Sequence, residues 1–299
     1  MSPVTKKHNK VMRTLFAPLR FVVKKCSKTK YVKLEYRYIT GHKLNLANPI
    51  RYTEKLQYLR LFTYPNDELV IKAASRDGLR NYAEEKGYKN NLIKCYGVFD
   101  KFDDIDFASL PDKFVMKCTH ACAFNEIVYD KASLDIKESK KKFDKWLATD
   151  YGKKTVEPHY SKIKPRIIIE ELLLENNELP VEYKIHVFNG IAKYMYVVTG
   201  RNKEIHYNNY LIDWKDFDEA QFNHWTKSEK EIKKPLCWAE AVKLAESLAS
   251  PFPFVRVDLY IINNKIYISE MTFTPAKGTL TFKDDKSDFV IGEWLTIQK

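Results

Sequence analysis

The sequence predicts an α+β fold whose antiparallel sheets are built from hairpins and interleaved with helices. Runs of alternating apolar and polar residues, which are typical of half-buried strands, occur in neighbouring pairs. Two of these runs meet at Asn189-Gly190, a strong signal for a two-residue hairpin turn. Between the hairpins lie segments with apolar residues three or four apart, as in amphipathic helices. With 299 residues, the chain can bury a sizeable core in one large domain or two closely packed lobes.

Composition and cysteine usage favour a protein of the cytoplasm. No apolar run approaches the ~20 residues needed to cross a bilayer. We expect no signal peptide, because no uninterrupted apolar core follows the basic N-terminus. The five cysteines lack disulfide-like spacing, which predicts a reducing compartment. Cys118 and Cys122 flank His120, but without a second matching pair they favour buried thiols over a zinc site.

The net charge of +12 is concentrated at the N-terminus. Residues 1–33 contain ten lysines and arginines and no acid, which leaves 41 basic and 39 acidic residues in 34–299. We therefore treat 1–33 as a separate arm and expect no nucleic-acid-binding surface on the body. The apolar and basic residues of 8–26 predict either a segment that lies on anionic lipid or a disordered arm, with RNA binding as a third alternative. Pro18 argues against one straight helix in this segment.

Two helices are expected after the arm. The first covers 51–61, and the second runs from 68 to 86 and ends at Gly87, a residue suited to a helix C-terminus. Lys72 and Arg76 would lie on one face of the second helix, four residues apart. Two such cations without an acid between them either face water or bind an anion.

Short strands and helices alternate over the next segments. We expect strands at 92–98, 113–117 and 123–129, a connector at 102–110, and helices at 133–151 and 238–248. The inward residues of the helix at 133–151 should be Ile136, Phe143, Trp146 and Leu147. The loop at 118–123 is made of small residues, which let a ligand approach backbone N–H groups, although it lacks a permissive glycine.

Acids and cations accompany the predicted strands beyond this loop. A buried strand at 165–174 contains Glu170 and Glu171, a pair that suits the edge of a cleft better than a core. In the next hairpin, the strand at 183–188 carries Lys184 and His186, and the strand at 192–199 is followed by Arg201. The residues around Trp214 and Trp225 are expected to be polar and irregular.

The C-terminal hairpin, 252–278, carries Asp258 on its first strand and Glu270 on its second. A carboxylate pair in an apolar setting is costly unless a cation lies between its members, and Mg²⁺ bound to nucleotide phosphates suits one or two carboxylates. A two-residue turn would put Asp258 opposite Ser269, whereas a three-residue loop, 263–265, would put it opposite Glu270. A metal site requires the second register. The alternative is a pair of solvated acids on an edge hairpin.

The order of these features resembles the ATP-grasp superfamily, and specifically the teichuronopeptide-biosynthesis-like ATP-grasp proteins of bacterial surface-polysaccharide loci. The resemblance spans roughly residues 50 to 280. The segments that carry it are RYTEKLQYLRLF, IKAASRDGLRNYAEEKGY, LIKCYGVFDKFDDIDF, LPDKFVMKCTH, PRIIIEELL, YKIHVFNG and VRVDLY with NNKIYISEMTFTP. Two departures are that Ala121-Cys122-Ala123 replaces a loop that usually bears glycine, and that Thr272 follows Glu270-Met271 where many relatives have Asn.

The resemblance implies two α+β lobes that clamp a nucleotide, with a small lobe at about 112–175 inside a catalytic region at 34–299. It implies that ATP and Mg²⁺ are bound, with Asp258 and Glu270 as the metal ligands. The residues implied on the nucleotide are Lys117 at the phosphate or adenine side, Glu170, Glu171 and Leu173 at the adenine, and Lys184 and Arg201 at the phosphates or the acyl phosphate. Lys72, Arg76 and His120 are expected on the acceptor or phosphate side. For His120 and His186, a structural role is an alternative.

The function implied is an ATP-dependent carboxylate–amine ligase of surface-polysaccharide biosynthesis (capsule, O-antigen or teichuronopeptide). It would link an amino acid to a uronic acid through an acyl phosphate, with arm 1–33 at the inner face of the plasma membrane. Three alternatives remain: a glycosyltransferase, a sugar kinase of the same pathway, or a non-catalytic glycan-binding relative.

Overall fold

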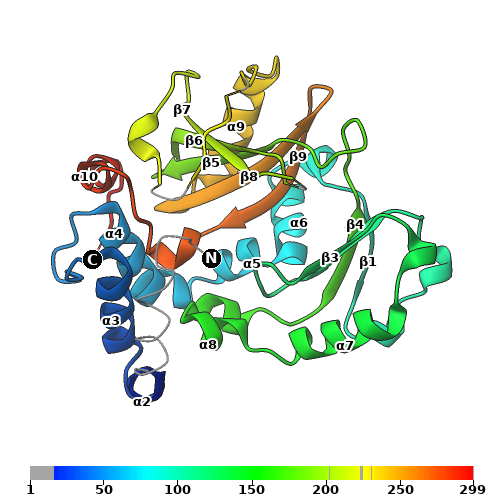
Figure 1. The fold of residues 1–299 in the computed structure, drawn as a ribbon, viewed down its shortest axis with the longest axis horizontal. Coiled ribbons are helices and arrows are strands. Elements are labelled where there is room, and N and C mark those ends of the chain that lie inside the picture. Colours follow the sequence, from blue (N-terminus) through cyan, green and yellow to red (C-terminus); the bar gives the residue numbers. More distant parts are fainter. Residues whose placement is uncertain (1–16, 202, 223–224, 230, 299) are drawn as a thin grey trace.

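The computed structural model describes residues 17–201, 203–222, 225–229 and 231–298. Within these residues, the strands form a four-stranded and a five-stranded antiparallel sheet (Figure 1). The small sheet has the order β1-β4-β2-β3 and consists of β1 (Cys95–Phe99), β2 (Phe114–Cys118), β3 (Asn125–Val128) and β4 (Ile167–Glu171). The large sheet has the order β7-β6-β5-β8-β9 and consists of β5 (Glu182–Phe188), β6 (Ile191–Thr199), β7 (His206–Leu211), β8 (Phe254–Ile262) and β9 (Lys265–Thr272). The expected α+β class with antiparallel sheets is confirmed.

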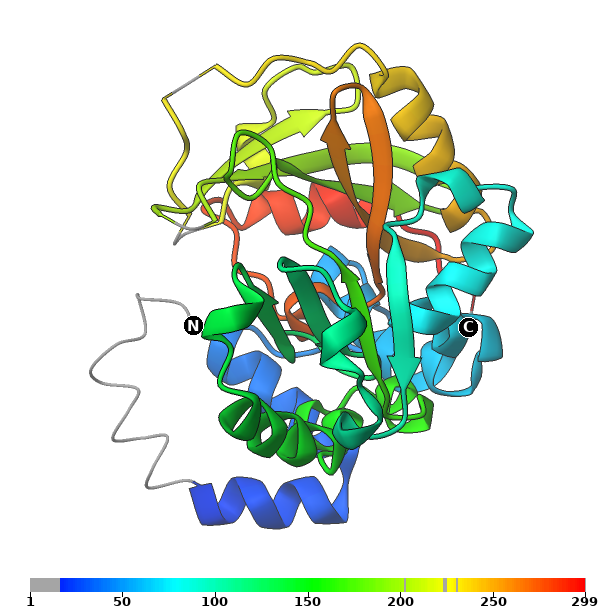
Figure 2. The same cartoon turned by 90° about the vertical axis from the view of Figure 1, so that its right-hand side faces the viewer.

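Helices pack against both sheets and join them. Their bounds are α2 (Ala17–Cys26), α3 (Lys28–Thr40), α4 (Tyr52–Tyr58), α5 (Glu68–Ala74), α6 (Arg76–Glu85), α7 (Ile136–Leu147), α8 (Tyr151–Thr155), α9 (Trp238–Ala249) and α10 (Lys286–Glu293). A π-helical turn, Leu59–Thr63, continues α4. In Figure 2 the large sheet lies above the small one, so the two sheets belong to two lobes of the molecule.

Each sheet has its own apolar core. On the large sheet, α9 buries Ala241, Leu244 and Leu248, which recur at helical spacing and pack with Ile185 and Val257. In the small lobe, Phe143 of α7 packs with the apolar residues of β2 and β4. Apolar side chains on one face of each sheet thus leave the opposite face for other roles.

The expected helix at 68–86 is two helices, because Ser75 between α5 and α6 is extended (φ −78°, ψ 137°). Gly78 permits the break, since a Cβ atom there would lie 2.3 Å from the carbonyl oxygen of Lys72. Lys72 and Arg76 therefore do not share a helix face. Lys72 Nζ donates to both carboxylate oxygens of Glu85, at 2.7 Å each.

The C-terminal hairpin has the pairing that a metal site requires, but it reaches that pairing without the three-residue loop. Its turn has two residues, Asn263 and Asn264, with φ of 50° and 58°, and Ile262 pairs with Lys265. A regular ladder from this turn would place Asp258 opposite Ser269. A β-bulge at Ser269 shifts the register by one residue, so that Asp258 pairs with Glu270.

The N-terminal boundary differs from the one expected. Residues 1–16 of the expected arm lie outside the described residues, but the boundary at residue 33 falls inside α3. The Ser27 side chain caps α3, and Val32 and Tyr36 are fully buried in a small cluster with Leu44. The apolar spacing of α3 thus ties the end of the basic segment to the body. Among the described residues, no helix is both long enough and apolar enough to cross a membrane.

Other expectations hold in part. The Asn189-Gly190 turn is confirmed, with φ of 48° and 81°. The strand β7 and the helix α10 occupy stretches for which no element was predicted. Ile136, expected in the core, is 48% exposed at the start of α7. β1 joins the small sheet although it precedes the expected small lobe at 112–175, because it pairs with β4.

Candidate functional site

A cavity of about 460 Å³ lies between the two lobes. Its volume is within the ~300–1,000 Å³ typical of small-molecule sites. The small lobe contributes Val115 and Lys117 of β2, Asn125 and Ile127 of β3, and the loop residues Cys122 and Ala123. The large sheet contributes Glu182, Lys184, Tyr196, Arg256, Tyr260 and Glu270, and the segment that joins the lobes contributes Glu171, Leu172, Leu173, Leu179 and Pro180.

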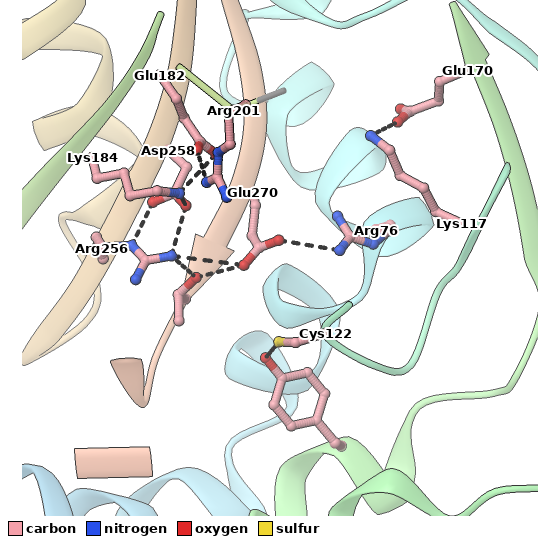
Figure 3. Close-up of polar contacts among 12 residues, drawn as sticks. Arg76, Lys117, Cys122, Glu170, Glu182, Lys184, Arg201, Arg256, Asp258 and Glu270 are labelled. Atoms are coloured by element: carbon pink, nitrogen blue, oxygen red, sulfur yellow. Dashed lines mark hydrogen bonds and ion pairs between the residues drawn. The ribbon is translucent and has the colours of Figure 1, made fainter. Parts of the chain in front are cut away.

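The polar face of the large sheet follows from strand alternation. Glu182 and Lys184 are two residues apart on β5, as are Arg256 and Asp258 on β8, so each pair shares a face. The register places Lys184 opposite Asp258, and the bulge at Ser269 places Glu270 on the other side of Asp258. Three strands therefore bring their charged residues together (Figure 3).

Asp258 lies at the centre of this cluster. It is 1% exposed, contacts Lys184, and accepts bonds from Arg256 Nε at 2.6 Å and Nη2 at 2.7 Å (Figure 3). A buried carboxylate is tolerated only with such partners. Asp258 is not part of the cavity lining, but it contacts Lys184 and Arg256, which are.

Glu270 faces the cavity between two guanidinium groups. Its oxygens lie 3.1 Å from Arg76 Nη2 and 3.9 Å from Arg256 Nη2, and Thr272 Oγ1 donates to it at 2.8 Å. Burial alone would raise the pKa of Glu270, but Arg76, Lys184 and Arg256 outweigh burial and lower the pKa to about 2. The carboxylate is therefore ionised at neutral pH.

Glu182 forms a second charged group at the cavity wall. It contacts Arg201 and lies 2.7 Å from Lys184 Nζ. Burial would raise the pKa of Glu182, but Lys184 and Arg201 lower it to about 2. Burial also disfavours the charged form of Lys184, yet Asp258 and Glu182 raise its pKa above the ordinary value. Lys184 therefore remains a cation at the cavity surface.

At the end of the cavity where adenine was expected, one residue differs from the sequence prediction. Glu171 and Leu173 line the cavity, whereas Glu170 does not. Glu170 is bound instead to Lys117 Nζ at 2.8 Å and to Arg80 Nη1 at 3.2 Å. Glu170 still lies on the cavity side of the small sheet, because its register partner Val115 and its ion-pair partner Lys117 both line the cavity.

Two residues expected at the site lie elsewhere. Lys72 is at the surface with Glu85. His120 is 1% exposed, its Nε2 lies 3.2 Å from the carbonyl oxygen of Thr149, and burial lowers its pKa. His186, considered as an alternative binding residue, stacks on Tyr194, and burial holds its pKa well below the ordinary value. The structure brings together the other expected residues: Arg76, Lys117, Glu171, Leu173, Lys184, Arg201 and Glu270 line the cavity, with Glu170 and Asp258 beside it.

Residues that were not expected complete the charge cluster. Arg256 binds Asp258, and its Nη1 donates to Tyr196 Oη at 2.8 Å. Glu182 holds Lys184 and Arg201. The sequence did contain a signal for both, since each stands two residues before an expected site residue on the same strand. Farther along the wall, Tyr207 stacks on Trp225 with ring centroids 3.9 Å apart.

The donor set at Asp258 and Glu270 suits Mg²⁺ together with a phosphate. The two carboxylates are register partners and supply oxygen ligands from one side. Among the described residues, no group of three or more His, Cys, Asp or Glu side chains converges on a metal position. Mg²⁺ commonly takes one or two carboxylates and completes its shell with water and substrate phosphates, so these residues fit the ion.

In a comparison with known protein families, residues 54–296 match the family model described as TupA-like ATPgrasp. No curated protein matches the chain. A D-alanine–D-alanine ligase from Bacillus anthracis complexed with ATP has 12% identity and a TM-score of 0.44, covering 69% of this chain and 56% of that one. The Helicobacter pylori D-alanine–D-alanine ligase has 14% identity and a TM-score of 0.44, covering 84% and 68%. The ATP-grasp ligase PsnB, complexed with a variant of its minimal precursor, Mg and ADP, has 7% identity and a TM-score of 0.43, covering 77% and 60%.

Proposed function

The chain belongs to the TupA-like ATP-grasp family, and we propose that it is an ATP-dependent ligase that joins a carboxylate to an amine. The observation that carries this proposal is the pairing of Asp258 with Glu270 beside the cations of an interlobe cavity. Mg²⁺ and a triphosphate need this combination of oxygen ligands and positive charge. The chain spans little more than half the length of the Bacillus anthracis ligase. The activity proposed here therefore rests on this chain's own residues and not on that enzyme.

We propose that the nucleotide lies along the cavity from the joining segment to the charge cluster. The adenine would contact Glu171 and Leu173, where the chain leaves β4 and backbone groups can read the base edge. Lys117 also lines the cavity. Lys184 and Arg201 would neutralise the phosphates, because both are cations at the cavity wall.

Asp258 and Glu270 would hold Mg²⁺, which neutralises phosphate charge and polarises the γ-phosphate when bound. Arg256 and Lys184 neutralise Asp258 when no metal is bound. With the metal bound, these two cations can turn to the charge that develops on the phosphates. The chain needs no side-chain nucleophile for this reaction.

The proposed reaction has two steps. A carboxylate oxygen of the acceptor attacks the γ-phosphorus, and the bond between the γ-phosphorus and the β–γ bridging oxygen breaks. ADP is the leaving group, and the acceptor becomes an acyl phosphate. The amine then attacks the acyl carbon, phosphate departs, and the nitrogen loses a proton to give the amide. Positioning by the two lobes and stabilisation of negative charge by the cluster would supply the rate enhancement.

For the substrates, we propose a uronic acid of a surface glycan as the acceptor and an amino acid as the amine. The family resemblance motivates this choice, and the stacked aromatic rings of Tyr207 and Trp225 on the cavity wall support it, because they offer an apolar platform for a sugar ring. A sugar kinase would use the same nucleotide site but would stop after phosphoryl transfer. The presence or absence of an amide product distinguishes the two.

We propose that the protein is cytoplasmic and that its basic N-terminal segment holds it at the inner face of the plasma membrane. Lys28, Lys30 and Lys33 are exposed on α3. Cations in a cluster without acids are attracted to anionic lipid headgroups. A glycan substrate carried on a lipid would then lie close to the cavity.

A thermal-shift titration with ATP, with and without Mg²⁺, tests the nucleotide site. We expect the melting temperature of the wild-type protein to rise saturably with ATP and to need Mg²⁺, because a ligand that binds only the folded state stabilises it. Asp258→Asn and Glu270→Gln should each lose the Mg²⁺-dependent part of the rise. ADP release with uronic acids and amino acids would then identify the substrates.

The control is Asp103→Asn, the same chemical change at an exposed residue that pairs with Lys140 on the small lobe. It should keep the full Mg²⁺-dependent rise. Asp258→Asn also removes the negative charge that compensates the buried cations Lys184 and Arg256, so it should lower the melting temperature without ligand. The quantity to compare between variants is therefore the rise in melting temperature on adding ligand. No rise in the wild type at millimolar ATP would contradict the ligase proposal.

A further inference from the structure

We propose that Arg76 binds the carboxylate of the acceptor substrate, and that it becomes available when Mg²⁺ and nucleotide engage Glu270. The inference rests on the proposed ligase function and adds to it a binding residue and an order of binding. Its basis is a single carboxylate, Glu270, that serves both as the partner of Arg76 and as a proposed metal ligand.

The break between α5 and α6 places Arg76 at the cavity. Arg76 is the first residue of α6, and its backbone N–H donates to the carbonyl oxygen of Thr119 at the start of the β2–β3 loop. Its side chain is 14% exposed and extends toward Glu270, with Nη2 3.1 Å from the carboxylate (Figure 3). Such a buried guanidinium is costly without a counterion.

Arg76 has unused capacity for an anion. A guanidinium group carries five N–H donors in a planar fork that matches a carboxylate. Within the described residues, Nε of Arg76 is buried without a hydrogen-bond partner, and the side-chain bond the group makes is the one to Glu270. A second carboxylate can therefore bind without displacing an existing partner of Nε.

A recess beside the main cavity provides the space. Arg76, Cys122 and Glu270 border both the large cavity and a recess of about 10 Å³. The remaining walls are mostly small or apolar residues: Ala73, Ala74, Ser75, Leu79, Ala121, Tyr160 and Met271. A space of this size holds about one water-sized polar group. A carboxylate that enters from the main cavity can therefore place an oxygen at Arg76.

The shared carboxylate couples the two binding events. When Glu270 turns to Mg²⁺, Arg76 loses its counterion, and an acceptor carboxylate restores the balance of charge. Each ligand therefore favours the other, as linkage requires. Without the acceptor, Arg76 competes with Mg²⁺ for Glu270 and weakens nucleotide binding. A residue that contacts the phosphates would strengthen nucleotide binding instead. Whether a mutation of Arg76 tightens or weakens nucleotide binding therefore distinguishes the two roles.

The test is isothermal titration of the full chain with Mg·ADP in chloride buffer and in acetate buffer of equal ionic strength. We expect Arg76→Gln to bind Mg·ADP about fivefold tighter than the wild type in chloride, at the lower end of coupling between sites in proteins. Acetate, as a simple carboxylate probe, should tighten Mg·ADP binding to the wild type and have no effect on Arg76→Gln. Arg76→Lys, which keeps the charge, should resemble the wild type in chloride.

Lys72→Gln is the matched control, since Lys72 lies four residues earlier and pairs with Glu85 at the surface. It should leave both titrations unchanged. Weaker Mg·ADP binding by Arg76→Gln would overturn the inference and make Arg76 a nucleotide ligand. Equal binding by Arg76→Gln and the wild type would overturn the inference and leave the ligase proposal intact. A wild type that binds no Mg·ADP would remove both.

Discussion

Ala123 occupies a backbone conformation that suits glycine. Its φ is 61°, in the left-handed region, and it lies in the β2–β3 loop at the cavity wall. In an L-residue this conformation costs about 1–2 kcal/mol because the Cβ atom approaches the carbonyl oxygen. The absence of glycine from this loop, visible in the sequence, is thus a source of local strain.

Replacing Ala123 with glycine should stabilise the protein. The relief of strain exceeds the extra backbone entropy that glycine brings to the unfolded chain, roughly 0.5–1 kcal/mol, so the free energy of unfolding should rise by about 0.5–1 kcal/mol. Denaturant titration measures the change. Ala121→Gly, in the same loop at a residue without a positive φ, should lower stability instead. A loss of stability in Ala123→Gly would show that the loop is not strained there.

At the scale of elements, an irregularity in a single strand decides whether the two proposed metal ligands, Asp258 and Glu270, pair with each other. The two-residue turn at Asn263-Asn264 sets a register in which Glu270 would face away from Asp258. The extra residue at Ser269 corrects that register, and both Ser269 and Glu270 line the cavity as a result. A bulge is thus part of the site's construction.

Deletion of Ser269 should leave the site working. Without the bulge, the regular ladder from the two-residue turn brings Glu270 opposite Asp258, so Mg²⁺-dependent stabilisation by ATP should persist. The thermal-shift titration described above measures this. The same deletion combined with Glu270→Gln should lose the stabilisation. If the deletion alone abolishes it in a folded protein, the bend of the bulge, and not the register, is what the site requires.

At the scale of the whole molecule, charge is divided between a basic N-terminal segment and a nearly balanced body. α2 and α3 lie together at one end of the molecule (Figure 1). Val32 and Tyr36 fasten α3 to the body, while Lys28, Lys30 and Lys33 remain exposed. The proposed membrane surface on α3 therefore has a fixed position relative to the lobes.

Reversing the charge of Lys28, Lys30 and Lys33 to glutamate should release the protein from anionic vesicles. Each lysine near such a surface contributes about 1 kcal/mol, so the partition coefficient should fall about a hundredfold or more. Sedimentation with phosphatidylserine vesicles measures it. The control reverses three exposed lysines of α7, Lys137, Lys141 and Lys145, and should bind as the wild type does. Equal loss in both variants would mean that only net charge matters.

Local patterns predicted much of the fold. Strand alternation located β5, β6, β8 and β9, and the Asn-Gly turn fixed the β5–β6 hairpin. Apolar spacing located α7 and α9, and the carboxylate pair of the last hairpin was recognised from its position. These features depend on residues close together in the chain, so a pattern of two or 3.6 residues is sufficient to reveal them.

Local periodicity and turn chemistry were sufficient to predict the α+β class and the main hairpins. The convergence of the charged residues is not local, because Lys184 and Asp258 are 74 residues apart and the pairing of Asp258 with Glu270 depends on the bulge at Ser269. Tertiary contacts alone set the ion-pair partners of Glu170, the separation of Lys72 from Arg76 at Ser75, and the burial of His120 beside the carbonyl of Thr149. These outcomes depend on contacts between distant segments, such as β1 with β4 and Arg76 with Glu270. A local sequence pattern does not predict such contacts, because they form and contribute stability only in the packed chain.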